Sequence, residues 1–309
     1  MDFLDIKTDF AFKKVFGSEE SKDILISFLN SVIEFEDDSH ISDVTIVDPY
    51  QNPLLQGMKD TYVDVKAVLS NGLRVIIEMQ VLYLEGFEKR ILYNAAKAYS
   101  TQLKKAELYS SLDPVIALTI TDFIMFEDID KMITYFRLLE KESFIKYSGD
   151  IELIFIELPK FNKQIDELVN IIDKWIYFIK HADELDYIPK VFGDMPLQKA
   201  FKIANTAQLT PKEYEQQEKR AFYIYSQKTL VEKSVERGMK KGMKKGMEKG
   251  MEKGMEKGME KGMEKGMGKG IQHQREISAK KMLELDLDSK IISKATGLTM
   301  EEIEQIRSK

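Results

Sequence analysis

The sequence predicts an α/β protein in which helices flank a mixed β-sheet, and three features support this prediction. Two apolar, β-branched segments within 59–81 meet at Asn71-Gly72, the strongest short-range signal for a β-hairpin. Apolar runs at 115–126 and 151–158 are typical of buried strands. Residues 85–112 have the 3.6-residue apolar period of an amphipathic helix with a basic side. This order of elements indicates a layered α/β domain with a mixed sheet.

The remaining elements of this region are predicted from the same kinds of signal. Residues 5–34 have a helical pattern that Gly17 interrupts. Strands are expected at 44–49 and, from a more ambiguous pattern, at 133–141. An apolar stripe over 162–180 predicts another helix, with Trp175 in the core rather than exposed for stacking.

Composition limits the chemistry that the chain can perform. The 309 residues include no cysteine, which excludes disulfides, thiolate catalysis and Cys-ligated zinc. Three histidines lie far apart, so we expect any metal to be held by carboxylates, which favours Mg²⁺ or Mn²⁺. No apolar run has membrane-spanning length and no signal region opens the chain, so we expect a cytoplasmic protein without a membrane partner. The net charge of −6 neither indicates nor excludes nucleic-acid binding, because the local field decides.

The hairpin carries the candidate chemistry. With a two-residue Asn71-Gly72 loop, Asp64 would face Met79, and Glu78 would point to the other side of the sheet. A three-residue loop with Gly72 in the left-handed region instead places Asp64 opposite Glu78, with Gln80 on the same face. We predict the second register, because only it assembles a site. Exposed carboxylates are the alternative, but directly opposed like charges are destabilising without a cation.

Residues 238–270 repeat Lys/Glu-Lys-Gly-Met every four residues. On an α-helix each methionine would fall about 40° beyond the previous one, so the stripe cannot form a left-handed coiled-coil seam. One glycine per repeat costs about 0.8–1 kcal/mol of helix propensity each time. We therefore expect a weak helix that serves as a spacer. Its basic start could follow phosphates, although a solvated linker needs no such role.

The predicted organisation has four parts. Residues 1–160 form the α/β core and 161–237 a helical extension, in which Thr210-Pro211 and Glu213 provide a helix start with a capping box. The repeat at 238–270 is a linker, and 271–309 form a small helical tail that resembles a helix-turn-helix unit. For this tail, dimerisation or simple packing is the alternative to DNA binding.

Two carboxylates that share a divalent ion are suited to phosphodiester hydrolysis. The ion polarises the phosphate and lowers the pKa of a bound water. Asp64 and Glu78 would be its ligands, and Gln80 would orient the attacking water.

Asp64, thirteen intervening residues and then Glu78-Met79-Gln80 resemble the PD-(D/E)XK nuclease motif. The flanking segments 8–17 and 87–93 and the Lys/Glu-Gly repeat resemble its recombination-promoting nuclease (Rpn) branch, also known as PD-(D/E)XK family transposases. The resemblance covers about residues 3–160, and it extends to the tail only in the general character of the Lys/Glu-Gly repeat. It implies a restriction-endonuclease-like fold and metal-dependent DNA endonuclease activity linked to recombination or mobile elements.

The resemblance also assigns roles to residues. Asp9 would lie near the metal, and Arg90 would hold a phosphate, for which its fork geometry is suited. Lys13 and Lys14 are further candidates for phosphate contacts, with an ordinary solvated helix face as the alternative. Gln80 stands where the wider superfamily has lysine, and Val63 where it has proline. Glutamine brings no positive charge, so a lysine from elsewhere, with Lys66 the nearest in sequence, is a candidate substitute.

Two functions therefore remain open. The first is a Mg²⁺-dependent DNA endonuclease with DNA as its partner. The second is a non-catalytic DNA-binding or oligomerising relic of the nuclease fold, which the missing lysine and the acidic charge balance favour. A homo-oligomer is compatible with both.

Overall fold

The computed structural model describes residues 2–35, 40–51 and 61–308. The chain divides into two compact units, Met1–Thr229 and Leu230–Lys309, which are described separately below. The finer division at residues 160, 237 and 270 remains a prediction. None of the described helices has both the length and the apolar character that a membrane crossing requires.

The first unit combines helices and strands in the order that the sequence predicts. Its helices are α1 (Asp9–Phe16), α2 (Lys22–Val32), α3 (Phe87–Ser100), α4 (Ile171–His181), α5 (Met195–Ile203) and the start of α6 (Pro211–Glu284). Its strands are β1 (Val44–Val47), β2 (Tyr50–Gln51), β3 (Thr61–Tyr62), β4 (Val65–Leu69), β5 (Arg74–Gln80), β6 (Val115–Thr121), β7 (Ile133–Arg137) and β8 (Ile151–Glu157).

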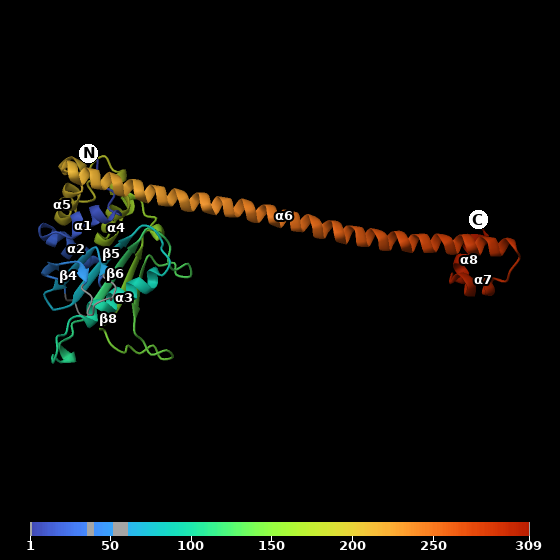
Figure 1. The fold of residues 1–309 in the computed structure, drawn as a ribbon, viewed down its shortest axis with the longest axis horizontal. Coiled ribbons are helices and arrows are strands. Elements are labelled where there is room, and N and C mark those ends of the chain that lie inside the picture. Colours follow the sequence, from blue (N-terminus) through green and yellow to red (C-terminus); the bar gives the residue numbers. More distant parts are fainter. Residues whose placement is uncertain (1, 36–39, 52–60, 309) are drawn as a thin grey trace. The chain divides into compact units, whose positions relative to one another are not determined.

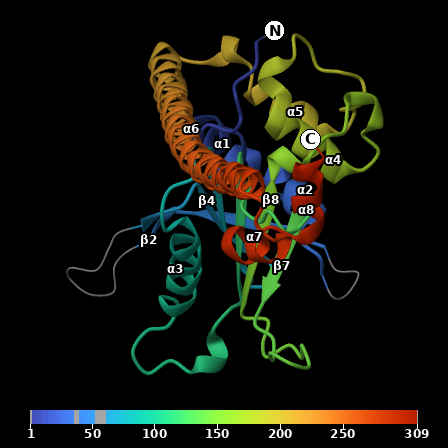
Figure 2. The same ribbon diagram turned by 90° about the vertical axis from the view of Figure 1, so that its right-hand side faces the viewer.

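Six of these strands form one mixed sheet in the order β1-β4-β5-β6-β8-β7. The neighbours β5, β6 and β8 run parallel, and the outer pairs are antiparallel. Helix α3 covers one face of the sheet, whereas α1, α2, α4 and α5 belong to the core on the other face (Figure 2). The predicted mixed sheet flanked by helices is thereby confirmed.

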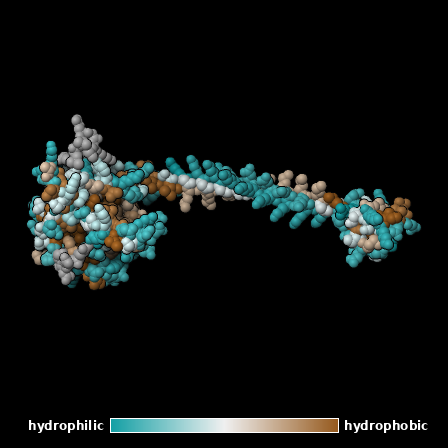
Figure 3. All heavy atoms as spheres, turned by 90° about the horizontal axis from the view of Figure 1, so that it is seen from below, coloured by the Kyte–Doolittle hydropathy of each residue, from teal (hydrophilic) through white to brown (hydrophobic). Residues whose placement is uncertain are grey.

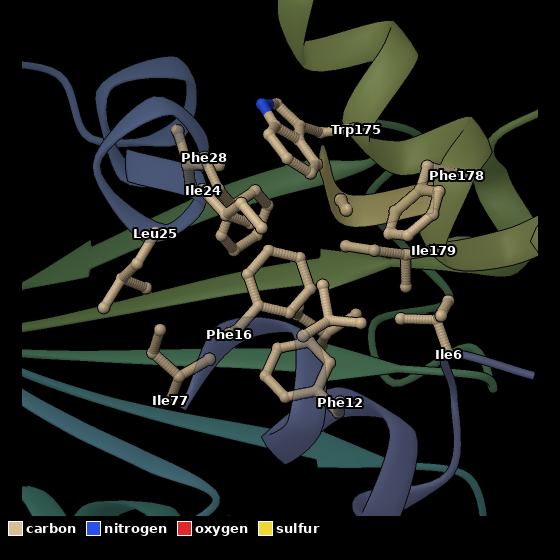
Figure 4. Packing of buried hydrophobic residues seen from close by; sticks show 14 of the residues in the cluster. Ile6, Phe12, Phe16, Ile24, Leu25, Phe28, Ile77, Trp175, Phe178 and Ile179 are labelled. Carbon is tan, nitrogen blue, oxygen red and sulfur yellow. The ribbon is translucent and has the colours of Figure 1, made fainter. Parts of the chain in front are cut away.

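The larger core lies between the sheet and the helices on that second face. Aromatic rings of Phe16, Phe28 and Trp175 contact one another there, with centroids 5.2–6.0 Å apart (Figure 4). Trp175 is fully buried, and its Nε1 donates to the hydroxyl of Ser27 at 3.2 Å. The prediction that Trp175 belongs to the core is confirmed.

The hairpin has the register that a three-residue loop produces. Leu69 N–H donates to the carbonyl of Leu73 at 2.8 Å, and Gly72 adopts a φ of 87°. Ladder pairing continues from this loop to Val65↔Ile77. It stops one residue before the predicted Asp64–Glu78 pair, where the Asp64 N–H donates to Ile77 O at 3.0 Å. The left-handed glycine is what makes the three-residue loop possible.

Several elements end or begin differently from the sequence prediction, because tertiary contacts override the apolar pattern. The strand predicted over 133–141 stops at Arg137. The helix predicted over 85–112 stops at Ser100, and Gln102 then bonds through its amide to the backbone of Asp113. The strand predicted over 115–126 stops at Thr121. The chain turns beyond it because the backbone N–H groups of Met125 and Phe126 donate to the buried Glu157 carboxylate, at 2.6 and 3.1 Å. Similarly, the helix predicted over 162–180 begins only at Ile171.

The start of α6 lies in the first unit and has the predicted cap. Glu213 N–H donates to Thr210 Oγ1, while Glu213 Oε2 accepts from the backbone N–H of Thr210 at 2.9 Å. The capping box and Pro211 at the first helical position are thus confirmed.

The second unit contains the rest of α6, α7 (Ser289–Thr296) and α8 (Met300–Arg307) (Figure 1). The Gly-Met repeat is helical throughout, and each of its eight methionines is 67–78% exposed. Its surface is mostly hydrophilic (Figure 3). The small terminal core contains Ala279, Ile292, Leu298 and Ile303. Asp288 caps α7, and Thr299 forms a capping box with Glu302.

Replacing Gly72 by alanine should destabilise the first unit by about 1–2 kcal/mol, because an L-residue is strained at a positive φ. Urea unfolding followed by tryptophan fluorescence reports on this unit, since Trp175 lies in its core. The matched control is Gly193→Ala, where an added Cβ makes only ordinary contact at 3.7 Å. Equal stability of the two variants would contradict the hairpin geometry.

Candidate functional site

The candidate site lies at the carboxyl end of the central parallel strands. The last residues of β5, β6 and β8 are in register, as Gln80↔Thr121↔Glu157. Open α/β sheets characteristically bind ligands beyond the carboxyl ends of their strands. Along β5, Val75, Ile77 and Met79 point into the larger core. Strand alternation therefore turns Glu78 and Gln80 to the face that α3 covers.

Asp64 is held where β4 begins. Its Oδ2 accepts the N–H of Met79 at 2.8 Å, and its Oδ1 lies 3.1 Å from Lys13 Nζ on α1. The side chain is only 11% exposed. Burial raises the pKa of Asp64, against the opposing effects of Lys13 and the Met79 N–H. The two partners therefore do not fully offset the cost of burying the ionised carboxylate.

Glu78 is similarly buried and is paired with Arg90 of α3. One terminal nitrogen of Arg90 donates both to Glu78 Oε1 and, at 2.7 Å, to Gln80 Oε1. Burial is the main cause that raises the pKa of Glu78, and the charge of Asp64 raises it further. The two carboxylates thus lie close enough to repel each other. Because α3 follows the hairpin directly, chain connectivity brings Arg90 over this strand face.

Gln80 uses both ends of its amide within the protein. Its Oε1 accepts from Arg90, and its Nε2 donates to the carbonyl of Leu82 at 2.7 Å. These bonds fix the side chain against the loop that follows β5. The arrangement is therefore suited to holding Arg90 in place.

Asn94 belongs to the site, although the sequence analysis did not single it out. It is 2% exposed, and its Nδ2 lies 3.5 Å from Glu78 Oε2. Its position four residues after Arg90 places it on the same side of α3. That spacing, together with an amide inside an amphipathic helix, is the signal from which it could have been found.

Asp9 lies on α1, one turn before Lys13, and its Oδ1 is 2.9 Å from Nε of Arg220 on α6. Its negative charge contributes to the raised pKa of Asp64. Arg220 is more than two hundred residues away in sequence, and no sequence pattern connects it with Asp9. The start of α6 also bonds to α1 through Gln217, which accepts from Thr8 Oγ1 at 3.1 Å.

The other two lysines proposed from sequence have different surroundings. Lys14 forms an ion pair with Glu213 at the start of α6. Lys66 pairs across the sheet with Ile76 and Val47. Burial and the neighbouring Arg74 lower the pKa of Lys66. Lys13 is therefore the lysine that the structure places against Asp64.

The donor set suits a hard divalent cation. No cluster of three or more Asp, Glu, His or Cys side chains that could hold a metal occurs in the part of the chain that the structure describes. Asp9 is thus not joined to Asp64 and Glu78 in such a cluster. Two hard carboxylate oxygens with raised pKa values remain, and Mg²⁺ typically takes one or two carboxylates and fills its shell with water and phosphate.

Comparison with known proteins agrees with this geometry. Residues 6–234, about three quarters of the chain, match the family described as PD-(D/E)XK nuclease family transposase. The chain belongs to this family. The match includes the site residues of the sheet, α1 and α3, and also the start of α6 with Arg220. No match is found among curated proteins or among solved structures.

The raised pKa of Glu78 predicts how Glu78→Gln affects stability. Below its unfolded-state pKa of 4.5, Glu78 is protonated in both states and contributes nothing. As the pH rises through the higher folded-state pKa, the wild-type protein must ionise a buried group. Its free energy of unfolding should therefore fall relative to Glu78→Gln. Urea unfolding in EDTA at about pH 4 and about pH 7 measures the difference.

Glu213→Gln is the matched control with the opposite sign. Hydrogen bonds from Lys14 and Thr210 lower the pKa of Glu213 to about 2. The ionised group therefore stabilises the fold above pH 4.5, and this contribution is lost as the pH falls towards 2. Wild type should gain stability over Glu213→Gln as the pH rises. The same pH trend in both variants would show that the environment of Glu78 is wrongly assigned.

Proposed function

We propose that this protein is a magnesium-dependent DNA endonuclease that acts in recombination or in mobile-element DNA. The observation that carries the proposal is the pair Asp64 and Glu78, two buried carboxylates of one hairpin that repel each other and whose pKa values burial raises. Such a pair is costly to keep ionised without a cation. Membership of a nuclease family makes DNA the expected substrate.

In this proposal Asp64 and Glu78 hold Mg²⁺ at the end of the hairpin. When bound, the ion would polarise the scissile phosphate and favour hydroxide as the nucleophile. Lys13 and Arg90 are each about one third to two fifths exposed, so both can reach a phosphate at the rim of the site. Their pairing with the carboxylates keeps two positive charges beside the position where phosphate charge develops.

Gln80 has a positioning role in this proposal. Sequence reasoning gave it the task of orienting water, but its amide is already bonded to Arg90 and to the carbonyl of Leu82. It holds the Arg90 guanidinium beside Glu78. Lys13 supplies the positive charge that lysine brings at this position in the wider superfamily, since its Nζ lies 3.1 Å from Asp64.

Purified protein should cleave plasmid DNA with Mg²⁺ and stop when EDTA is added. Asp64→Asn and Glu78→Gln should lose more than about 100-fold in rate, because even indirect partners of a metal cost 10–100-fold. Saturating Mg²⁺ should also stabilise wild type against urea, by about 2.7 kcal/mol at 100 times the dissociation constant, but not these variants.

Glu152→Gln is the matched control, because Glu152 is likewise a buried strand carboxylate paired with an arginine, Arg137. It should cleave as wild type does. Cleavage by Asp64→Asn at the wild-type rate would remove the basis of the assignment.

Lys13→Met should reduce the cleavage rate by about 100-fold, as expected for the loss of one charge-stabilising donor in a catalytic site. Lys66→Met should cleave normally, because Lys66 neighbours Arg74 and Asp48 rather than the carboxylates. Lys14→Met is a second control, one residue from Lys13 but paired with Glu213. A larger loss of cleavage rate in Lys66→Met than in Lys13→Met would show that Lys66 on β4, rather than Lys13, supplies the positive charge at the site.

A non-catalytic DNA-binding protein is the second candidate. It is favoured by the full use of Gln80 within the protein and by the ion pairs that Lys13 and Arg90 already make. DNA binding that needs no metal, with no cleavage of any DNA form, would establish this alternative. Cleavage that Asp64→Asn abolishes would exclude it.

A further inference from the structure

A pocket of about 540 Å³, a volume that suits a small ligand, opens between α3 and β3 beside Glu78. Its lining includes Tyr62, Glu78, Lys89, Arg90, Tyr93 and Asn94. We call it the α3 pocket. Because Glu78 and Arg90 belong both to this pocket and to the candidate site, a ligand in the pocket would lie directly beside the reacting phosphate.

We propose that the α3 pocket binds a single unpaired nucleobase of the DNA substrate. This inference deepens the proposed nuclease function and rests on it. A base inside a duplex is stacked on both sides, so only an unpaired or extruded base can enter such a pocket. The substrate class is therefore DNA with a bulge, a mismatch or a single-stranded segment at the cleavage point.

Two tyrosines provide surfaces for a base. Tyr62 is 67% exposed and Tyr93 is 36% exposed, and both line the α3 pocket from different elements. Large exposed aromatic side chains next to cations are a usual arrangement for single-stranded nucleic acid, because every base has a face that stacks on them. Lys89 and Arg90 supply the positive charge for the adjoining phosphates.

Asn94 supplies the polar recognition group. Its Nδ2 faces the Glu78 carboxylate, and within the described residues its buried Oδ1 has no hydrogen-bond partner. A buried acceptor without a donor is unfavourable, so an N–H group on a ligand would complete it. All four DNA bases carry such a group on the edge that pairing normally occupies. Base pairing and the contact with Asn94 Oδ1 would use the same N–H group of the base. Only an unpaired base is therefore free to make this contact.

The test measures binding by fluorescence anisotropy in EDTA, with Asp64→Ala as the background so that no cleavage occurs. Three hairpin DNAs are compared: fully paired, with one bulged adenosine, and with a bulged abasic site. The abasic DNA keeps the bend and the phosphate but lacks the base. We expect the bulged adenosine to bind at least about tenfold more tightly than the abasic DNA, as the loss of one base–aromatic stack implies.

Tyr93→Ala should remove most of this preference without changing the affinity for paired DNA. Asn94→Leu should also remove most of the preference, and it is compared with wild type only by the ratio of bulged to abasic affinity. Leu92→Ala is the matched control, because Leu92 is exposed on α3 beside Tyr93 but does not line the pocket. Tyr93 is exposed, so its variant keeps the proposal testable if the buried Asn94→Leu fails to fold. Equal affinity for bulged adenosine and abasic DNA, or a preference that survives in both variants, would overturn the proposal.

Free dAMP distinguishes the source of the base. If the pocket serves the DNA substrate, millimolar dAMP competes weakly and the preference for bulged DNA remains. If dAMP binds while bulged and abasic DNA bind equally, the pocket takes a free nucleotide and the proposal is wrong. A separate cleavage assay with Mg²⁺ tests the nuclease function by itself. Cleavage of paired DNA without any preference for bulged DNA would contradict only the proposal that the pocket binds a base. A preference for bulged DNA without any cleavage would contradict only the proposed nuclease activity.

Discussion

The constraint on which the site depends is the burial of two carboxylates on one hairpin. Asp64 and Glu78 each have one cationic partner, Lys13 and Arg90, yet burial still raises the pKa of both acids. The fold therefore retains an unfavourable arrangement at the end of its central strands.

The partners of these carboxylates come from elements on both faces of the sheet. Lys13 lies on α1, which packs with the larger core, whereas Arg90 lies on α3, which covers the opposite face. The start of α6 adds a further layer through Arg220 and Gln217, which hold α1 at Asp9 and Thr8. Lys228 of α6 also pairs with Asp122, directly after β6. The position of α1 over the site thus depends on a helix that begins two hundred residues later.

The repeat illustrates how much a regular sequence leaves open. Its four-residue period excludes a left-handed coiled-coil seam, and its methionines are exposed along α6. Glycine in every repeat lowers the intrinsic stability of that helix. The terminal helices are a separate case, because their caps at Asp288 and Thr299 and the left-handed Gly297 follow directly from residue type. Helix α8 carries three glutamates and one arginine, a charge that does not suit a duplex.

Sequence alone determined the features that depend on local chemistry. The hairpin register followed from Gly72, since only a residue free to adopt a positive φ allows the three-residue loop. The buried strands, the cap of α6 at Thr210 and the mixed sheet followed from apolar period and capping residues. The candidate acids Asp64 and Glu78 were also visible, because carboxylates inside β-branched strands are costly without a partner.

Tertiary structure alone decided which side chains meet those acids. Lys13 of α1, rather than Lys66 of β4, lies against Asp64, with 3.1 Å between Lys13 Nζ and Asp64 Oδ1. The amide of Gln80 is engaged by Arg90 and Leu82, and Asp9 is paired with Arg220. Element ends shifted for the same reason, as when the Glu157 carboxylate turned the chain after β6. Contacts between distant segments leave no periodic signal, so only the folded chain could reveal them.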